Sequence, residues 1–325
     1  LRLSMKSGAT QNIVATVYVD GQESDNASFE YTSSDPAIAT VDENGTVTPV
    51  AVGSAIVTVK SGDVATYVSA EVYTLTMATV DDWTEMLHSF NDVNARFYLL
   101  NNLDFSGVAY RTYTEWNDDE ANDKFFMGEL DGGGHTVSNV TFDNAFGEQS
   151  MFGVSIASYL HDIAFTNVKF NGSRQMGLYS STRHVIDNGS VVSVARINNV
   201  VCDFVYSADA TGETCGIAGS VYGLNMDNVF VNMRRSDGSA FDPTKHYAIA
   251  DEYYIWYNPN AISNVVFCAN GGSVNAQGQL LLGSINLVSD TYFVCDSIID
   301  ATYKAFNVLN RNVFDITPGA IPTFK

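Results

Sequence analysis

The first 73 residues alternate apolar and polar side chains with a period of two, which is typical of half-buried strands. Five runs follow this pattern: 13–19, 29–33, 38–42, 46–48 and 54–59. Asp20-Gly21 follows the first run, and Asn44-Gly45 lies between the third and fourth. These residue types tolerate the positive φ that tight hairpin turns require. Short strands with such frequent turns predict a β-sandwich over residues 1–73.

The rest of the chain repeats a short motif: an apolar residue, a polar one, Asn or Asp, then Val or Ile. Its third positions, separated by 23, 37, 29 and 36 residues, are Asn139, Asp162, Asn199, Asn228 and Asn264. A glycine segment ends at Gly153 and Gly219, each nine residues before a copy of the motif, and 281–283 resembles a later one. Such spacing is typical of one coil of a parallel β-helix. The repeated Asn and Asp are expected at a bend, satisfying backbone groups in a ladder, as structural residues.

An amphipathic helix is predicted for residues 80–90, where apolar side chains recur every three to four positions. Asp81 or Asp82 is expected to cap its N-terminus. The first strand of the second domain is predicted for residues 97–105. The helix would then cover the open apolar end of a stack of coils, which a repeat protein needs for solubility.

Two stretches of sequence resemble known families. Residues 33–48 and 52–59 resemble the group 2 bacterial Ig-like domain, which implies a spacer in a bacterial surface protein. Residues 97–105, 126–142 and 314–325 are similar to the start and closing strand of GLUG-type, pectin-lyase-like β-helices. That resemblance implies a surface or secreted protein more than a reaction. The expected fold is therefore all-β: an Ig-like sandwich (1–73) and a single-stranded right-handed parallel β-helix (74–325) with a short capping helix.

Composition narrows the possible partners. Lys and Arg number 16 against 37 Asp and Glu, giving a net charge of −21. This balance disfavours nucleic acid and anionic membranes, and it leaves neutral glycans or divalent cations. No apolar run reaches the roughly 18 residues of a membrane span. The sequence begins with Leu1 rather than methionine, so removal of an upstream export signal is expected.

Four cysteines occur without a CxxC pair, which argues against a zinc knuckle: Cys202, Cys215, Cys268 and Cys295. They are interpreted as small buried hydrophobic residues. A disulfide between Cys202 and Cys215 stays open as an alternative. The glycine run 131–134 before His135 is not followed by the Lys-Ser/Thr of a phosphate loop and is interpreted as a structural turn.

Two groups of charged residues are candidates for binding. An acidic run offers oxygen ligands that suit Ca²⁺, although it lacks the Gly and closing Glu of a calcium loop and a solvated loop is the favoured explanation; its candidate ligands are Glu115, Asp118, Asp119 and Asp123. Arg174, Arg183 and His184 fall in one predicted insertion, 171–196, and are candidates for contacting an anionic sugar. No cofactor is otherwise implied.

An aromatic segment is the strongest candidate for a ligand site. It falls in the 36-residue gap between Asn228 and Asn264, within a predicted excursion 233–261, and comprises Tyr247, Tyr253, Tyr254, Trp256 and Tyr257. Such rings stack on sugars and anchor protein interfaces, and they can also simply cover a core. The sequence thus favours a non-enzymatic surface module that binds a glycan or host protein. A polysaccharide lyase or hydrolase and a bacteriophage virion surface protein are alternatives, and the oligomeric state stays open.

Overall fold

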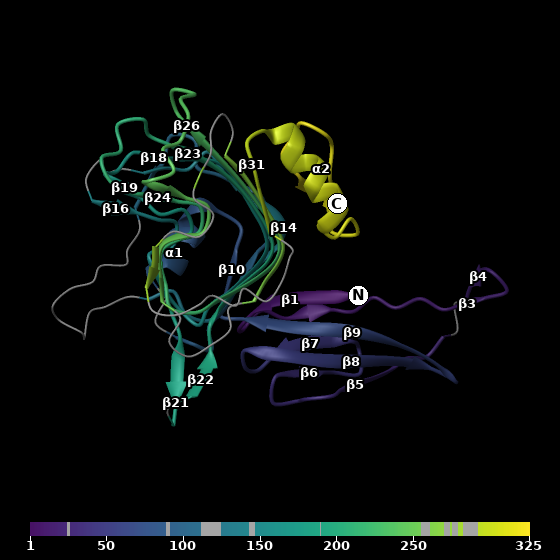
Figure 1. The fold of residues 1–325 in the computed structure, drawn as a ribbon. Coiled ribbons are helices and arrows are strands. Elements are labelled where there is room, and N and C mark those ends of the chain that lie inside the picture. Colours follow the sequence, from purple (N-terminus) through teal and green to yellow (C-terminus); the bar gives the residue numbers. More distant parts are fainter. Residues whose placement is uncertain are drawn as a thin grey trace. The chain divides into compact units, whose positions relative to one another are not determined.

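The computed structural model describes residues 1–24, 27–88, 92–111, 125–142, 147–188, 190–254, 261–269, 274, 279–281 and 292–325. The chain divides into two compact units: residues 1–77 with 94–98, and residues 78–93 with 99–325. Strands predominate in both, and the part of the chain described here contains the helices α1 and α2 (Figure 1).

The first unit is a sandwich of two sheets. Its strands are β1 (Arg2–Lys6), β2 (Gln11–Asn12), β3 (Tyr18–Val19), β4 (Gln22–Glu23), β5 (Glu30–Ser33), β6 (Ala39–Val41), β7 (Thr46–Pro49), β8 (Gly53–Ser61), β9 (Val64–Tyr73), β10 (Leu75–Met77) and β11 (Arg96–Leu99). One sheet has the order β1-β9-β8-β5 and the other β2-β7-β6. Val47 from the second sheet packs with Val57 and Val72 from the first in one buried cluster. Alternation along the strands supplies these inward side chains, as predicted for an Ig-like domain.

Both predicted turns of this unit are confirmed, but one predicted strand is wrong. Asp20 and Gly21 have φ of 50° and 81° between β3 and β4, and Gly45 has φ of 80° between β6 and β7. The run predicted at 13–19 forms a strand only at Tyr18–Val19. Ile13 is buried and Val14 is 85% exposed. The alternating pattern reports burial on one side, and it does not ensure a strand partner.

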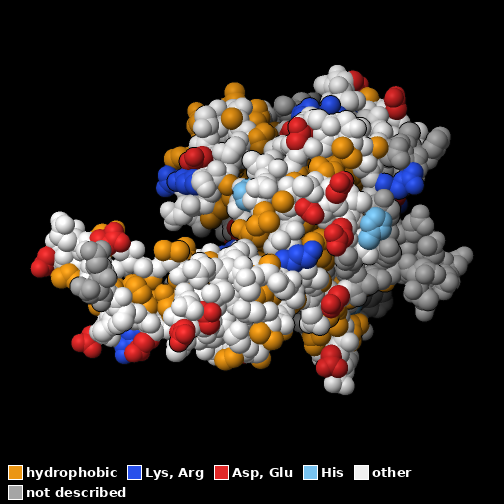
Figure 2. All heavy atoms as spheres, turned by 180° about the vertical axis from the view of Figure 1, so that it is seen from behind, with side chains coloured by type: hydrophobic (Ala, Val, Ile, Leu, Met, Phe, Trp, Pro, Cys, Tyr) orange, Lys and Arg blue, Asp and Glu red, His pale blue; other side chains and the backbone are white. Residues whose placement is uncertain are grey.

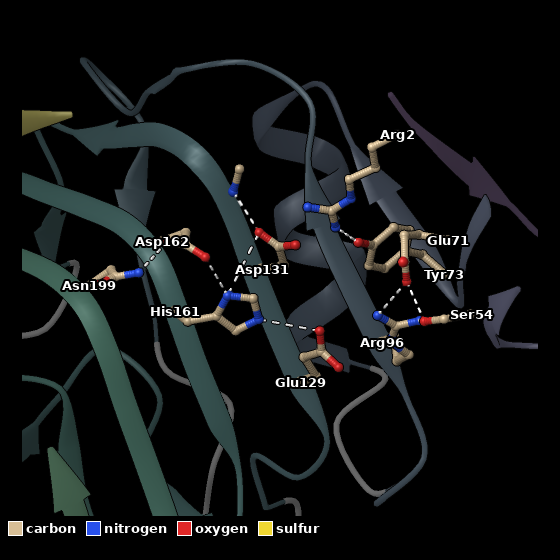
Figure 3. A network of polar contacts seen from close by, with 11 residues as sticks. Arg2, Ser54, Glu71, Tyr73, Arg96, Glu129, Asp131, His161, Asp162 and Asn199 are labelled. Carbon is tan, nitrogen blue, oxygen red and sulfur yellow. Dashed lines mark hydrogen bonds and ion pairs between the residues drawn. The ribbon is translucent and has the colours of Figure 1, made fainter. Parts of the chain in front are cut away.

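A polar network lies within the first unit, around Glu71 on β9. Its carboxylate accepts hydrogen bonds from Ser54, Ser69 and Arg96, with an Arg96 Nη2 to Oε2 distance of 3.1 Å (Figure 3). The Arg96 guanidinium also lies 4.9 Å from the centre of the Tyr73 ring. Every member is thus engaged inside the unit, so the network is structural.

The second unit is built from three parallel sheets. The largest contains, in order, β14 (Glu129–Ser138), β18 (Tyr159–Phe170), β23 (Ala195–Tyr206), β26 (Leu224–Arg235), β29 (Ile262–Ala269) and β31 (Tyr292–Cys295), with the short β12 (Leu103–Asp104), β13 (Ala109–Tyr110) and β15 (Thr141–Phe142) beside it. The second contains β16 (Glu148–Gln149), β19 (Arg174–Gln175), β24 (Thr214–Cys215) and β27 (His246–Tyr247). The third contains β17 (Val154–Ile156), β20 (Tyr179–Arg183), β25 (Ala218–Val221), β28 (Ala250–Tyr254) and β30 (Gln279–Leu281).

Successive stretches of chain supply one strand to each sheet, and each such stretch is here termed a coil. Equivalent residues of consecutive coils stand in register, so that Leu160 pairs with Ile197, which pairs with Met226. All three side chains are at most 1% exposed. The core of this unit is therefore a set of stacked apolar columns, each supplied by residues far apart in sequence.

A column of Asn and Asp side chains follows the bend of the large sheet. Asp162, Asn199, Asn228 and Asn264 have φ between 52° and 59°, a region that these residue types tolerate. The Asn199 amide donates to Asp162 (2.7 Å), and the Asn228 amide donates to Asn199 (2.6 Å). This ladder agrees with the structural interpretation of the motif.

The first copy of the motif belongs to a different ladder. Val137 pairs with Phe165, which places Asn139 opposite Asn167 rather than Asp162. The Asn167 amide donates to Asn139 at 2.8 Å, and the Asn139 amide donates to Asp104 at 2.9 Å. A side chain at Gly132 would meet the carbonyl oxygen of Asp162 at 2.4 Å, so glycine fills the equivalent bend in β14. The assumption that every copy of the motif occupies one position was therefore wrong.

Helix α1 (Val80–His88) closes against the interior of the second unit. Trp83 is fully buried, and its ring lies 5.9 Å from that of Phe152 and 6.3 Å from that of Phe165. Thr79 caps the helix through its hydroxyl, and Asp82 accepts in return from the backbone N–H of Thr79. The cap is thus Thr79 with Asp82 as its reciprocal partner, rather than Asp81 or Asp82 alone.

The predicted strand 97–105 is interrupted, because β11 ends at Leu99 and β12 begins at Leu103. The segment 314–325 contains β32 (Phe314–Asp315) and β33 (Thr323–Phe324), which pair with each other in antiparallel fashion. Helix α2 (Ile298–Val308) packs across the large sheet (Figure 1). No described helix is long and apolar enough to cross a membrane.

Candidate functional site

A cluster of charged side chains lies on the second sheet of the second unit. Glu148 and Arg174 are paired in register on β16 and β19, and Glu213 directly precedes β24 on the next coil. The Arg174 guanidinium contacts Glu148 at 2.6 Å, Glu213 at 2.9 Å and Asp251 at 3.6 Å. We term Glu148, Arg174, Glu213 and Asp251 the Arg174 cluster. One cation is thus shared by three carboxylates.

The carboxyl groups of this cluster differ in their environments. Burial raises the pKa of Glu148 against the opposing charge of Arg174. Burial and the charge of Glu213 raise the pKa of Asp251. The pKa of Glu213 is lowered, because hydrogen bonds from its own backbone and from Arg174 outweigh its burial. The cluster therefore combines carboxyl groups that hold a proton more readily with one that ionises easily.

A stack of aromatic and cationic groups follows on the third sheet. Arg183 directly precedes His184, and the register of β20, β25 and β28 places Arg183, Tyr222 and Tyr254 in one column. The Arg183 guanidinium lies 4.0 Å from the centre of the Tyr222 ring. The rings of Tyr222 and Tyr254 are 4.2 Å apart and nearly parallel, at 10°. We term these three residues the Tyr222 stack.

Glu252 connects the stack to the Arg174 cluster. It accepts hydrogen bonds from Tyr254 (3.0 Å) and Ser220 (3.1 Å), and its charge contributes to the raised pKa values of Glu148 and Asp251. Hydrogen bonds with Tyr222 and Glu252 raise the pKa of Tyr254. The result is a partly exposed strip of hydroxyl, carboxylate and guanidinium groups held by regular strands.

The predicted site residues are distributed unevenly over this strip. Arg174 lies in the Arg174 cluster, and Arg183 and Tyr254 lie in the Tyr222 stack. The His184 Nδ1 is 2.6 Å from the Tyr222 carbonyl oxygen. Tyr247 is only 5% exposed and donates to the Thr244 carbonyl oxygen at 2.9 Å. The positions of Glu115, Asp118, Asp119, Asp123, Trp256, Tyr257 and the Tyr253 side chain lie outside what the structure describes.

The predicted excursion at 233–261 is wrong for residues 246–254. These residues form β27 and β28, which continue the second and third sheets. Similarly, within 171–196, residues 174–175 and 179–183 are regular strands, and only the hairpin of β21 (Val185–Asp187) and β22 (Ser190–Ser193) projects from them (Figure 1). Sequence reasoning missed Tyr222 and Glu252, because their importance depends on the register between coils.

A second polar cluster lies on the large sheet. His161 on β18 is flanked by Glu129 and Asp131 of β14, and by its neighbour Asp162 (Figure 3). Its Nε2 lies 3.2 Å from Glu129, and its Nδ1 lies 2.8 Å from Asp162 and 3.9 Å from Asp131. Burial lowers the pKa of His161, but the hydrogen bonds with Asp162 and Glu129 outweigh it and raise the pKa to about 9. We term these four residues the His161 cluster.

All four cysteines are free and buried, so no disulfide joins Cys202 to Cys215. Burial raises the pKa of each thiol, as expected for small hydrophobic core residues. On the face of the molecule shown in Figure 2, acidic side chains are spread rather than gathered in one patch. The overall acidic charge therefore does not mark a binding surface, and the candidate sites are the local clusters described above.

Comparison with known proteins identifies the first unit. Residues 2–72 match the bacterial Ig-like domain (group 2) family. This match covers the sandwich alone, which is less than half of the chain.

Two further similarities extend into the second unit. The chain is 26% identical over 217 residues to halomucin of Haloquadratum walsbyi, a match that covers 55% of this chain and 2% of halomucin. The structure is also similar to a crystal structure of a candidate immunoglobulin A1 protease from Bacteroides ovatus, with a TM-score of 0.45 and 14% identity over 77% of this chain and 91% of that one. Neither similarity assigns an activity to the second unit.

Proposed function

We propose that this chain is a cell-surface or extracellular module in which the Ig-like unit is a spacer and the second unit binds a glycan. The bacterial Ig-like match and the halomucin similarity support the location. None of the similar proteins described above is a virion protein, so the virion alternative gains no support. The observation that carries the binding role is the Tyr222 stack beside Glu252 and the Arg174 cluster.

The strip suits a hydroxyl-rich ligand for a physical reason. Both faces of the Tyr222 ring are occupied, because Arg183 and Tyr254 flank it in the column. A sugar would therefore meet ring edges, phenol hydroxyls and the Glu252 carboxylate. These groups are held in place before binding, so less side-chain entropy is lost when a ligand arrives. Carboxylate and guanidinium groups then form hydrogen bonds with adjacent sugar hydroxyls.

A glycan microarray with the full chain tests this role. We expect binding to neutral glycans, a loss of at least about tenfold in affinity for Tyr254→Ala, and a smaller loss for Tyr254→Phe, which keeps the ring but not the hydroxyl. Tyr303→Ala, at a 58% exposed tyrosine on α2, is the matched control and should bind normally. Unchanged binding by Tyr254→Ala would show that any glycan binds elsewhere.

We also propose that the second unit is a right-handed β-helix of the GLUG type, as the sequence resemblance implies. Support comes from the parallel order β14-β18-β23-β26-β29-β31 and from the two smaller parallel sheets that repeat the same succession. An experimental structure of residues 74–325 tests both the handedness and the domain boundary. A different connection between the three sheets would refute the assignment.

A polysaccharide hydrolase or lyase acting at the Arg174 cluster is the second candidate. The specific observation in its favour is the raised pKa of both Glu148 and Asp251, because a general acid needs a carboxyl group that keeps its proton. Incubation with a panel of neutral and acidic polysaccharides should release new reducing ends or unsaturated products. Release that persists unchanged in Glu148→Gln and Asp251→Asn would exclude this cluster as the active site.

A further inference from the structure

We propose that the His161 cluster binds one transition-metal ion of the zinc type, through Nε2 of His161 and the carboxylates of Glu129 and Asp131. The ligand atoms that these three residues offer lie within 4.8 Å of one another. They come from adjacent, paired strands, since Glu129 stands opposite Tyr159 and Asp131 opposite His161. The backbone that positions them is therefore a regular sheet rather than a loop.

The spacing of the atoms suits a small ion. Two ligands bound at about 2.0–2.1 Å with tetrahedral angles are separated by roughly 3.3 Å. The His161 Nε2 and the Glu129 carboxylate are 3.2 Å apart. The Asp131 carboxylate lies 3.9 Å from Nδ1, so it must turn toward Nε2 to complete the site. Three protein ligands leave a position open for water or for an external ligand. An imidazole among the donors favours zinc-type ions over Ca²⁺, which prefers oxygen.

The surroundings of the three ligands are also those of a metal site. A histidine bound to a metal through one nitrogen usually donates its other ring N–H to a carboxylate, which fixes the ring. Asp162 supplies this acceptor 2.8 Å from Nδ1, and the Asn199 amide in turn donates to Asp162 at 2.7 Å. The backbone N–H of Gly133 donates to Asp131 at 2.8 Å. Each of these contacts fixes the orientation of a ligand or of its neighbour (Figure 3).

The identity of residue 162 is an independent observation. The bend of the large sheet carries Asn at positions 199, 228 and 264, all at positive φ, and the Asn228 amide donates to Asn199. Asn therefore satisfies both the backbone conformation and the ladder. Among the described residues of that ladder, only the coil that carries His161 has an aspartate at this position. The ladder bond from Asn199 needs only a neutral carbonyl oxygen, whereas the Nδ1–H of a metal-bound imidazole is usually held by a carboxylate.

The location allows an ion to enter. The Asp162 and Glu129 side chains are 36% and 25% exposed, whereas those of His161 and Asp131 are 10% and 3% exposed. The cluster is thus closed on the side of the sheet and open toward the surface. The ion would lie on the large sheet, and the proposed glycan strip lies on the other two, so the two proposals do not depend on each other.

Zinc binding to the chelator-treated full chain tests the site, at about pH 8, where proton competition is weaker. Titration calorimetry should give one Zn²⁺ per chain, with a Kd on the order of 10 µM or below, unaffected by millimolar Ca²⁺. Co²⁺ as a probe should give the visible absorption of a low-symmetry site. His161→Ala should weaken binding at least about 100-fold, and Glu129→Gln about tenfold or more.

Asp162→Asn is the sharpest variant, because the other coils already carry Asn at this position and the fold should be unaffected. We expect a 10- to 100-fold weaker affinity for Zn²⁺ with an unchanged circular dichroism spectrum. His88→Ala, at an exposed histidine on α1, is the matched control and should bind zinc normally. A folded wild-type chain that binds no stoichiometric Zn²⁺, or a folded His161→Ala variant that binds it as tightly as wild type, would overturn the proposal. Tyr254→Ala should keep its zinc, which separates this test from that of glycan binding.

Discussion

Replacing Asn228 should destabilise the second unit, and the order of two variants reveals why. Asn228 is 3% exposed and has φ of 59°. Its amide donates to Asn199 at 2.6 Å, and its Oδ1 accepts from the backbone N–H of Asn310 at 2.7 Å. Asn228→Ala loses both hydrogen bonds, at about 1–1.5 kcal/mol each. It also places alanine at positive φ, without the short polar side chain that lets Asn tolerate this region, which costs roughly 1–2 kcal/mol.

The expected loss for Asn228→Ala is therefore about 3–5 kcal/mol in the free energy of unfolding. Asn228→Gly loses the same hydrogen bonds but tolerates the backbone conformation, so it should be milder by about 1 kcal/mol. This order reverses the usual one, in which Ala is the better tolerated of the two residues. Gly is milder than Ala here only if the backbone conformation at the bend contributes to stability in addition to the side-chain hydrogen bonds.

Urea denaturation followed by tryptophan fluorescence measures this difference. Trp83, Trp116 and Trp256 all follow residue 77, so the signal reports the second unit without interference from the Ig-like unit. If Asn228→Ala proved as stable as Asn228→Gly, the argument from backbone conformation would be refuted. If both variants lay within 1 kcal/mol of wild type, the buried ladder would contribute far less than its hydrogen bonds indicate.

Three further predictions follow from the second unit. Burial, with the charge of Arg235 next, lowers the pKa of His246 to about 4, below its ordinary value of 6.5. As the pH falls, the unfolded chain therefore takes up a proton at this histidine before the folded chain does. The free energy of unfolding should decrease between about pH 6.5 and 4 by at most roughly 3 kcal/mol, or about half of that after screening by solvent. In His246→Gln, the urea midpoint should depend less on pH over this range. Gly216→Ala should cost at least about 3 kcal/mol, or abolish folding, because the added carbon would lie 2.3 Å from the Ala248 carbonyl oxygen. Gly238→Ala adds a carbon in open space, at a φ of 72°, and should cost only about 1 kcal/mol. Native protein should not react with a thiol reagent until it unfolds, since all four cysteines are buried, and a fast-reacting thiol in native conditions would contradict this packing.

The sequence predicted the elements whose signals are local. The turns at Asp20-Gly21 and Asn44-Gly45 and helix α1 depend on neighbouring residues only, and they form where expected. Register between coils is a different kind of information, because it depends on the lengths of the intervening segments. Asn139 fits the repeated motif as well as Asn199 does, yet a glycine bend earlier in β14 moves it to another ladder.

The same limit explains the candidate site. Tyr222 and Arg183 are 39 residues apart and meet only because their strands pair in register. Conversely, residues 246–254 looked like an excursion because aromatic and charged residues interrupt the motif, although they continue two sheets. Helix α2 had a readable signal that sequence reasoning passed over. Ser297 caps it and accepts from the Asp300 N–H, and its apolar positions Ile298, Ala301 and Ala305 recur every three to four residues.

Helix α2 has a consequence for how the second unit responds to mechanical force. Stacked coils can in principle peel away one after another, because each contacts only its neighbours. Ala301 and Ala305 of α2 belong to one buried cluster with residues from five successive strands, namely Ala164, Val201, Phe230, Val266 and Cys295. The helix itself packs on β26, β29 and β31, so a pull on the chain must remove it before these coils can unravel in turn. A protein held under tension between a cell and its surroundings would resist that first step as a single event.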